Sequence, residues 1–155
     1  KKFNNISQNI AHFGFSLLIL SILFNSLFSS EIITNLKVGE TFEDLNTKII
    51  LKSIEQKEEK NFKSIIANFN IENSKGIIEN LSPELRIYNQ PNIVTSEADI
   101  KTTMMSDKFI VINVVQNQDY FNVRYQVKPF MLWIWLSVLL ISFGGLLSLF
   151  KKNYE

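Results

Sequence analysis

The sequence contains no cysteine and only one histidine, His12, among its 155 residues. Disulfide bonds, thiolate metal sites and catalysis by a thiol nucleophile are therefore excluded within this chain. The sequence also lacks a P-loop, a Gly-x-Gly-x-x-Gly fingerprint, a Gly-x-Ser-x-Gly motif and a metal-binding pair of histidines. Its carboxylates are scattered, with no partner that would adapt them to acid–base chemistry. The residues alone therefore indicate no catalytic site.

Charged residues are missing from two long stretches. The C-terminal stretch runs from Pro129 to Phe150 and has lysines at both ends. A helix rises about 1.5 Å per residue and needs roughly 20 apolar residues to cross the hydrocarbon core of a bilayer. We therefore predict a transmembrane helix over residues 128–150. Pro129 suits the first turn of such a helix, where its missing N–H leaves no bond unmade.

Four residues are predicted to anchor this helix in the membrane. Trp133 and Trp135 carry amphipathic rings that settle at the level of the lipid headgroups. A haem platform is the alternative role for the two rings, but their place at the membrane boundary favours anchoring. Lys151 and Lys152 end the span and hold residues 151–155 on the cytoplasmic side by the positive-inside rule.

The second uncharged stretch, residues 8–28, is rich in Ile, Leu and Phe. A cleaved signal peptide is the alternative here, because Lys1 and Lys2 supply a basic start. The stretch is longer than a typical signal core, and no clear small-x-small cleavage pattern follows it, so we predict a retained transmembrane helix. The basic end at residues 1–7 is then cytoplasmic, and residues 29–127 lie on the opposite face, in the periplasm.

The middle region has the pattern of a small β domain. Residues 30–127 hold 11 Lys and Arg against 14 Asp and Glu, a net charge of −3 that gives no sign of a nucleic-acid partner. Short runs rich in Ile, Val, Phe and Tyr alternate with polar turns, and a first strand with a Gly39 turn is expected at Leu36–Glu40. The other runs cover residues 48–54, 62–71, 75–78, 84–88, 109–115 and 120–127. The expected fold is an antiparallel sandwich or partly closed barrel between two transmembrane helices.

Alternation is clearest in the last run, which reads as a half-buried strand. The apolar face holds Phe121, Val123, Tyr125 and Val127, and the polar face holds Asn122, Arg124 and Gln126. Two polar segments, Lys57–Lys60 and Gln116–Asp119, are predicted to be hairpin connections, the first of them a solvated tip.

His12 is the strongest candidate for a functional side chain in this sequence. It lies in the first predicted span, next to Ala11 and two residues before Gly14. A polar side chain in a span is costly and indicates a functional site. Neutral imidazole is a good axial ligand for haem iron, and nearby small residues let a macrocycle or a helix approach closely. A hydrogen bond from His12 to a neighbouring helix is the alternative, because six-coordinate haem needs a second ligand that this chain lacks.

Three patches of sequence carry a family resemblance. They are Ile10–Gly14, which reads Ile-Ala-His-Phe-Gly; Arg86–Tyr88 with Thr95–Ile100; and Val123–Arg124 with Lys128–Trp135 and Gly144–Leu147. In this order, over nearly the whole chain, they resemble the C-terminal part of CcmF, the family of membrane haem lyases of cytochrome c maturation. Asp107–Val111 stands where that family has Asp-Leu-Tyr-Val.

The resemblance implies a part in the covalent attachment of haem to apocytochrome c. It further implies a haem b in the membrane, held by histidines on two spans, with His12 as one axial ligand of the haem iron and the second ligand outside this chain. The implied partners are the remaining spans of the lyase, the haem chaperone CcmE, a CcmH-type subunit and an apocytochrome c. The implied location is a bacterial inner membrane, or an organellar one.

The tryptophan-rich segment and periplasmic histidines that such lyases use for haem transfer are not in this sequence, so no residue of this chain is predicted to be catalytic. The alternative function is a membrane-anchored periplasmic scaffold that binds no haem. For Arg86 and Arg124, pairing with haem propionates or acidic partner residues is weighed against simple strand-surface cations. Glu97 and Asp99 are expected in a solvated turn, and Gly144–Gly145 at a close helix contact.

Overall fold

The computed structural model describes residues 2–115 and 119–151. The chain forms two compact units. One unit holds both helices together with residues 102–107 and 127–130, and the other holds residues 31–101 and 108–126. In chain order the elements are α1 (Lys2–Phe28), β1 (Ser30–Leu36), β2 (Thr41–Asp44), β3 (Thr47–Glu58), β4 (Phe62–Asn73), β5 (Ile78–Leu81), β6 (Glu84–Asn89), β7 (Asn92–Glu97), β8 (Asp99–Thr102), β9 (Ser106–Val114), β10 (Phe121–Pro129) and α2 (Met131–Lys151).

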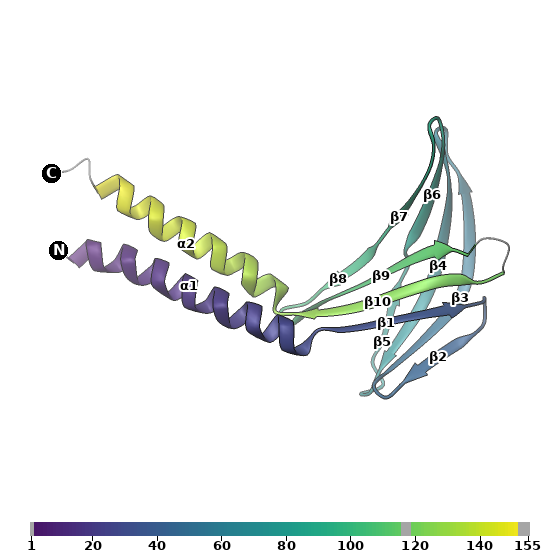
Figure 1. Cartoon of the computed structure of the whole chain (residues 1–155), viewed down its shortest axis with the longest axis horizontal. Coiled ribbons are helices and arrows are strands. Elements are labelled where there is room, and N and C mark those ends of the chain that lie inside the picture. The colour runs from purple at the N-terminus through teal and green to yellow at the C-terminus, as the bar shows by residue number, and fades with distance from the viewer. Residues whose placement is uncertain (1, 116–118, 152–155) are drawn as a thin grey trace. The chain divides into compact units, whose positions relative to one another are not determined.

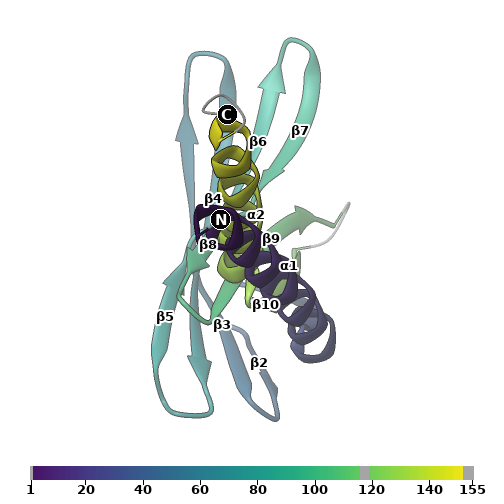
Figure 2. The same ribbon diagram turned by 90° about the vertical axis from the view of Figure 1, so that its left-hand side faces the viewer.

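In the helical unit, α1 and α2 lie side by side and run in opposite directions (Figures 1 and 2). Small residues form the contact between them. A Cβ atom added to Gly144 would lie 2.8 Å from the backbone nitrogen of Ala11, and one added to Gly14 would lie 3.0 Å from the Cγ1 of Ile141. The two glycines therefore let the helix backbones approach more closely than larger residues would allow.

The helix pair buries small polar residues and exposes large apolar ones. Ser7, Ser21 and Ser137 are buried, whereas Phe13, Ile19 and most leucines of α2 point outward. A soluble helical hairpin would bury its large apolar side chains instead. The apolar stretches Ile6–Phe28 and Met131–Leu149, of 23 and 19 residues, are long enough to cross a membrane. The distribution fits helices surrounded by lipid or by further apolar helices.

The β unit contains strands of two sheets. The four-stranded sheet has the order β1-β10-β9-β8, and the six-stranded sheet has the order β2-β3-β4-β6-β7, with β5 paired to β4. Both sheets supply residues to the core, which is dominated by branched aliphatic side chains. The largest fully buried side chains include Ile49, Leu51, Phe69, Ile71, Leu85, Ile110, Ile112 and Val123. The expected fold class, two apolar helices around a small antiparallel β domain, is confirmed.

Most predicted strands are present, and two predictions were wrong. Leu36–Glu40 is not a strand, because β1 ends at Leu36 and a turn follows in which Gly39 has φ 86° and Glu40 N–H bonds the Lys37 carbonyl at 3.0 Å. Residues 75–77 form a turn around Gly76, with φ 73°, so β5 starts only at Ile78. A glycine suits both turns because a side chain disfavours positive φ.

Four strands were not predicted, namely β1, which shares only Leu36 with the expected first strand, and the short strands β2, β7 and β8. They have four to seven residues, and few of their side chains are buried. All four lie at sheet edges, where no buried face imposes a strict alternation of apolar residues. Glu97 and Asp99, expected in a turn, are strand residues on either side of Ala98.

The last strand keeps the predicted register with one exception. Val123 and Tyr125 are buried, and Phe121 and Val127 are half-buried. Gln126, expected on the outer face, is also buried, and its Nε2 donates a hydrogen bond of 2.7 Å to Oε1 of Glu31 on β1. The neighbouring strand therefore covers this end of the polar face.

The hairpin tip predicted at Lys57–Lys60 is confirmed, since β3 ends at Glu58, β4 begins at Phe62 and the residues between them are exposed. The predicted connection Gln116–Asp119 lies outside the described residues, except for Asp119. α2 begins at Met131, so Pro129 ends β10 instead of opening the helix.

Candidate functional site

His12 lies on the exposed surface of α1 and lines a shallow groove of about 180 Å³. The groove lies between α1 and α2, and its other lining residues are Ser7, Gln8, Ala11, Gly144, Gly145 and Ser148. The backbone carbonyl of His12 accepts a hydrogen bond of 3.0 Å from the hydroxyl of Ser16. No side chain that the structure describes hydrogen-bonds the imidazole, so the ring is available to a group outside this chain.

The two adjacent glycines have different roles. Gly144 faces α1, where an added Cβ would come within 2.9 Å of the Ser7 carbonyl oxygen. Gly145 also lines the groove, but an added Cβ there would meet nothing within 4 Å. Gly144 is therefore the close helix contact expected from the sequence, and Gly145 leaves open space beside His12.

This arrangement fits half of a bis-histidine haem site. An unpaired imidazole projects from an apolar helix, and the small residues beside it leave room for a flat macrocycle or another helix. His12 is the only histidine in the sequence, so this chain offers no second imidazole.

Residues 27–129 match the family model described as the CcmF C-terminal beta-sandwich. The chain belongs to the CcmF family. It is 37% identical over 119 residues to the cytochrome c-type biogenesis protein ccl1 of Rhodobacter capsulatus, covering 77% of this chain and 18% of that protein. It is 30% identical over 148 residues to the cytochrome c-type biogenesis protein CcmF of Pseudomonas fluorescens, covering 96% and 22%. This CcmF-family chain thus spans about a fifth of the length of these relatives.

A solved structure named cytochrome c heme lyase CcmF has the same fold, with a TM-score of 0.73 at 16% sequence identity. The likeness covers 94% of this chain and 24% of that one. Membership of the CcmF family and the two long apolar helices together make this a membrane protein.

The predicted membrane anchors of this CcmF-family chain differ in their surroundings. Trp133 is half-buried, and its indole Nε1 donates a hydrogen bond of 2.9 Å to the carbonyl oxygen of Met104. Trp135 is 64% exposed. Lys151 is the last residue of α2, whereas its side chain and the whole of Lys152 lie outside the described residues. Their anchoring roles remain predictions.

Both arginines considered for haem propionates are paired within the β unit. Arg86 forms a two-point ion pair with Glu84, with hydrogen bonds of 3.0 and 3.1 Å, and its guanidinium lies over the ring of Phe62. The pKa of the Glu84 carboxyl is lowered first by Arg86 and then by the hydroxyl of Ser64. Arg124 pairs with Glu31. In the described residues both arginines are thus partly exposed strand residues, each paired with a glutamate.

The sequence did not predict a charge cluster around the buried carboxylate of Glu79. Glu79 on β5 binds Lys108 on β9 at 2.8 Å and Lys101 on β8 at 3.7 Å. Burial, with a smaller contribution from Glu79, raises the pKa of the Tyr125 hydroxyl to about 12. β5 belongs to the six-stranded sheet and the other three strands to the four-stranded sheet, so the cluster links the two. No spacing in the sequence signals it, because its members come from four separate strands.

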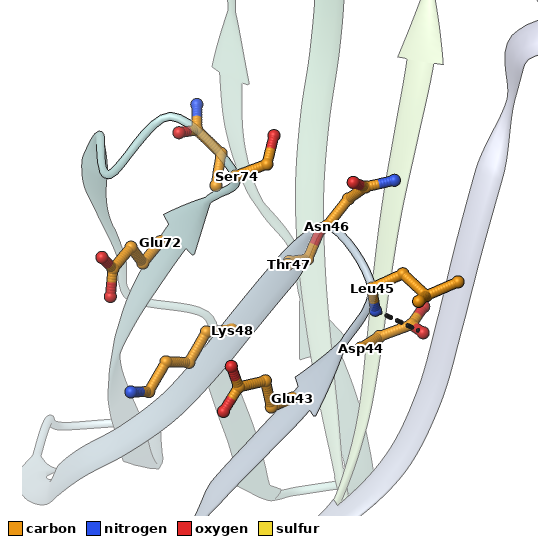
Figure 3. A pocket seen from close by; sticks show the side chains of 9 residues that line it. Glu43, Asp44, Leu45, Asn46, Thr47, Lys48, Glu72 and Ser74 are labelled. Carbon is orange, nitrogen blue, oxygen red and sulfur yellow. Dashed lines mark hydrogen bonds between the residues drawn. The ribbon is translucent and has the colours of Figure 1, made fainter.

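A hollow of about 180 Å³ at the β2–β3 turn collects acidic side chains but makes no metal site (Figure 3). Lys48 stands opposite Glu43 on β2 and opposite Glu72 on β4, which is a cross-strand arrangement of opposite charges. Asp44 accepts a hydrogen bond of 2.7 Å from the backbone of Leu45 within the turn. Among the described residues no group of three acidic or histidine side chains converges as metal ligands would.

Proposed function

We propose that this chain is the C-terminal part of a membrane haem lyase that attaches haem covalently to apocytochrome c, and that His12 supplies one axial ligand to a haem b. The observation that carries this proposal is the exposed, unpaired imidazole of His12 beside the open surface at Gly145, in a chain of the CcmF family. The names of the relatives, cytochrome c-type biogenesis proteins, support the process.

The bound haem would supply an iron centre capable of one-electron chemistry. Within this chain, His12 would hold the iron from one side, and the Gly144 contact would fix the helix that carries it. The second axial ligand would come from another span of the lyase. Haem transfer to the apocytochrome would take place on groups outside this chain, so its own residues bind and position and are not catalytic.

The proposed topology has residues 1–7 and 151–155 in the cytoplasm, spans at 8–28 and 128–150, and residues 29–127 in the periplasm of a bacterial inner membrane. There the β domain would lie among the haem chaperone CcmE, a CcmH-type subunit and the apocytochrome. Glu58, an exposed residue at the end of β3, provides a test. A Glu58→Cys variant should react with a membrane-impermeant thiol reagent in cells whose inner membrane is intact. Labelling only after that membrane is broken contradicts the topology.

The haem ligand is tested by His12→Ala in the full-length protein. Removing one of two imidazole ligands should convert low-spin six-coordinate iron to a high-spin or five-coordinate form, or release the haem. The Soret and α bands should therefore change and cytochrome c maturation should fall, and added imidazole should restore part of the low-spin spectrum.

The matched control is Asn9→Ala, which removes an exposed polar side chain of α1 that does not line the groove. Its spectrum and maturation activity should equal those of the unmodified protein. A His12→Ala protein with an unaltered low-spin spectrum would show that His12 is structural. A full-length protein that carries no haem b would favour the scaffold function.

A further inference from the structure

The turn between β8 and β9, residues Thr103–Met105, belongs to the helical unit. Two hydrogen bonds fasten it to the start of α2. The indole of Trp133 donates to the carbonyl oxygen of Met104 at 2.9 Å, and the backbone N–H of Phe130 donates to the carbonyl oxygen of Met105 at 2.8 Å. The turn is also closed on itself, because the backbone N–H of Thr103 donates to the carbonyl of Ser106 at 3.0 Å.

These bonds set the depth of the turn relative to α2. Trp133 is the third residue of the helix, and a helix advances about 1.5 Å per residue, so the turn lies level with the first turn of α2. That is where the apolar stretch Met131–Leu149 begins. If α2 crosses the membrane, this turn lies at the boundary between headgroups and acyl chains.

The side chains at the tip of the turn are apolar and project outward. Met104 is 69% exposed and Met105 is 65% exposed. The charged residues on either side, Lys101 and Asp107, lie outside the segment 102–106, and Lys101 is directed to Glu79 of the β unit. Thioether side chains are flexible and adapt to an irregular apolar environment.

The backbone hydrogen bonds of the tip also suit an apolar environment. A carbonyl group in contact with acyl chains is costly unless it is hydrogen-bonded within the protein. The carbonyl groups of Met104 and Met105 both accept such bonds, from Trp133 and Phe130. The turn at Leu45 is not a comparable apolar tip. Leu45 is 95% exposed, but it directly follows two acidic residues, Glu43 and Asp44.

We propose that Met104 and Met105 insert into the headgroup–acyl boundary of the leaflet at which α2 begins, so that the β8–β9 turn attaches to lipid in addition to the two helices. Lipid is the occupant because the tip continues the outward apolar surface of the helical unit. Exposed side chains of that surface at the same end include Trp135 on α2 and Phe28 on α1. The proposal depends on α2 being a span and is independent of haem binding by His12.

Spin labelling tests this directly. The full-length protein, with the introduced cysteine as its only cysteine, is labelled with a nitroxide at Met104→Cys or Met105→Cys and reconstituted in vesicles of phosphatidylcholine and phosphatidylglycerol. Collisions with oxygen, which concentrates in lipid, are compared with collisions with a water-soluble nickel chelate. Leu139→Cys, on the exposed side of α2, is the lipid reference, and Leu45→Cys is the aqueous reference for an exposed apolar residue.

We expect the ratio of oxygen to nickel collisions at both methionine positions to exceed that at position 45 several-fold and to approach that at position 139. A ratio equal to that at position 45 would mean that the tip is in water and would overturn the proposal. Protection from both reagents would mean that protein covers the tip, and it would also overturn the proposal. The haem spectrum of each labelled protein is recorded separately, so failure of the His12 assignment is distinguishable.

Discussion

The side-chain amide of Asn25, near the end of α1, donates a hydrogen bond of 2.6 Å to the carbonyl oxygen of Pro129, the last residue of β10. The two residues are 104 positions apart in the sequence. Phe130, which follows, has a positive φ of 60° that a bulky residue seldom adopts. Its ring packs against Phe24 with 5.2 Å between ring centroids. Asn25 and Phe24 together hold the chain where it turns from strand into helix.

Asn25→Leu should therefore destabilise the helix pair. The substitution leaves the partly buried carbonyl of Pro129 without its donor, and we expect a loss of about 1 to 3 kcal/mol in the free energy of unfolding. Ser26→Ala, at the next and exposed position, should change it by less than about 0.5 kcal/mol. Unfolding in a denaturing detergent, followed by circular dichroism, measures both. Equal losses would show that the Asn25 bond contributes nothing.

Leucine substitutions at the two adjacent glycines should affect different properties, stability at Gly144 and haem content at Gly145. Gly144→Leu forces a side chain against the backbone of Ala11 and Ser7, and overpacking of this kind typically costs about 1 to 3 kcal/mol. Gly145→Leu adds a side chain in open space, so the stability of the helix pair should not fall. It should instead lower the haem b content several-fold, because it blocks the surface beside His12. Thermal unfolding and the haem-to-protein ratio separate the two effects, and normal haem content in Gly145→Leu would argue against a macrocycle in this groove.

The buried Tyr125 should make the chain less stable in alkali. Burial raises its pKa to about 12, against about 10 for an exposed tyrosine. The folded state thus holds the phenol proton more tightly than the unfolded state, and the stabilisation, complete below pH 10, is lost as the pH rises through 12. The loss should reach about 2 to 3 kcal/mol. Urea unfolding between pH 8 and 12 should show a steeper decline for the unmodified chain than for Tyr125→Phe, and parallel curves would contradict the prediction.

The register of β10 is tested by two substitutions that introduce the same charge on opposite faces. Val123 is fully buried, so Val123→Asp places an unpaired carboxylate in the core and should destabilise the β unit by several kcal/mol. Asn122 bonds the exposed side chain of Asn35 at 2.9 Å, so Asn122→Asp should cost about 1 kcal/mol or less. Similar melting temperatures for the two variants would mean that the faces of the strand are assigned wrongly.

The helices and the long strands could be predicted because their signals are local. A long, mainly apolar stretch without charged residues is enough to predict α1 and α2, and alternation is enough to predict that Val123 and Tyr125 face the core. The short edge strands β7 and β8 carry no such signal, since little of either is buried. His12 was singled out as a candidate for a local reason as well, because a lone polar ring is conspicuous in an apolar stretch.

The sequence by itself determined where the apolar helices and the principal strands lie, and that the first helix carries the single imidazole of the chain. Only the tertiary structure decided which of two identical neighbours, Gly144 and Gly145, packs against α1 and which stays open. The tertiary structure also buried Gln126, which hydrogen-bonds Glu31, and it brought Glu79 of one sheet into an ion pair with Lys108 of the other. The physical reason is that hydrophobic periodicity acts along the chain, whereas close packing and ion pairing depend on residues that only the fold brings within a few ångströms of one another.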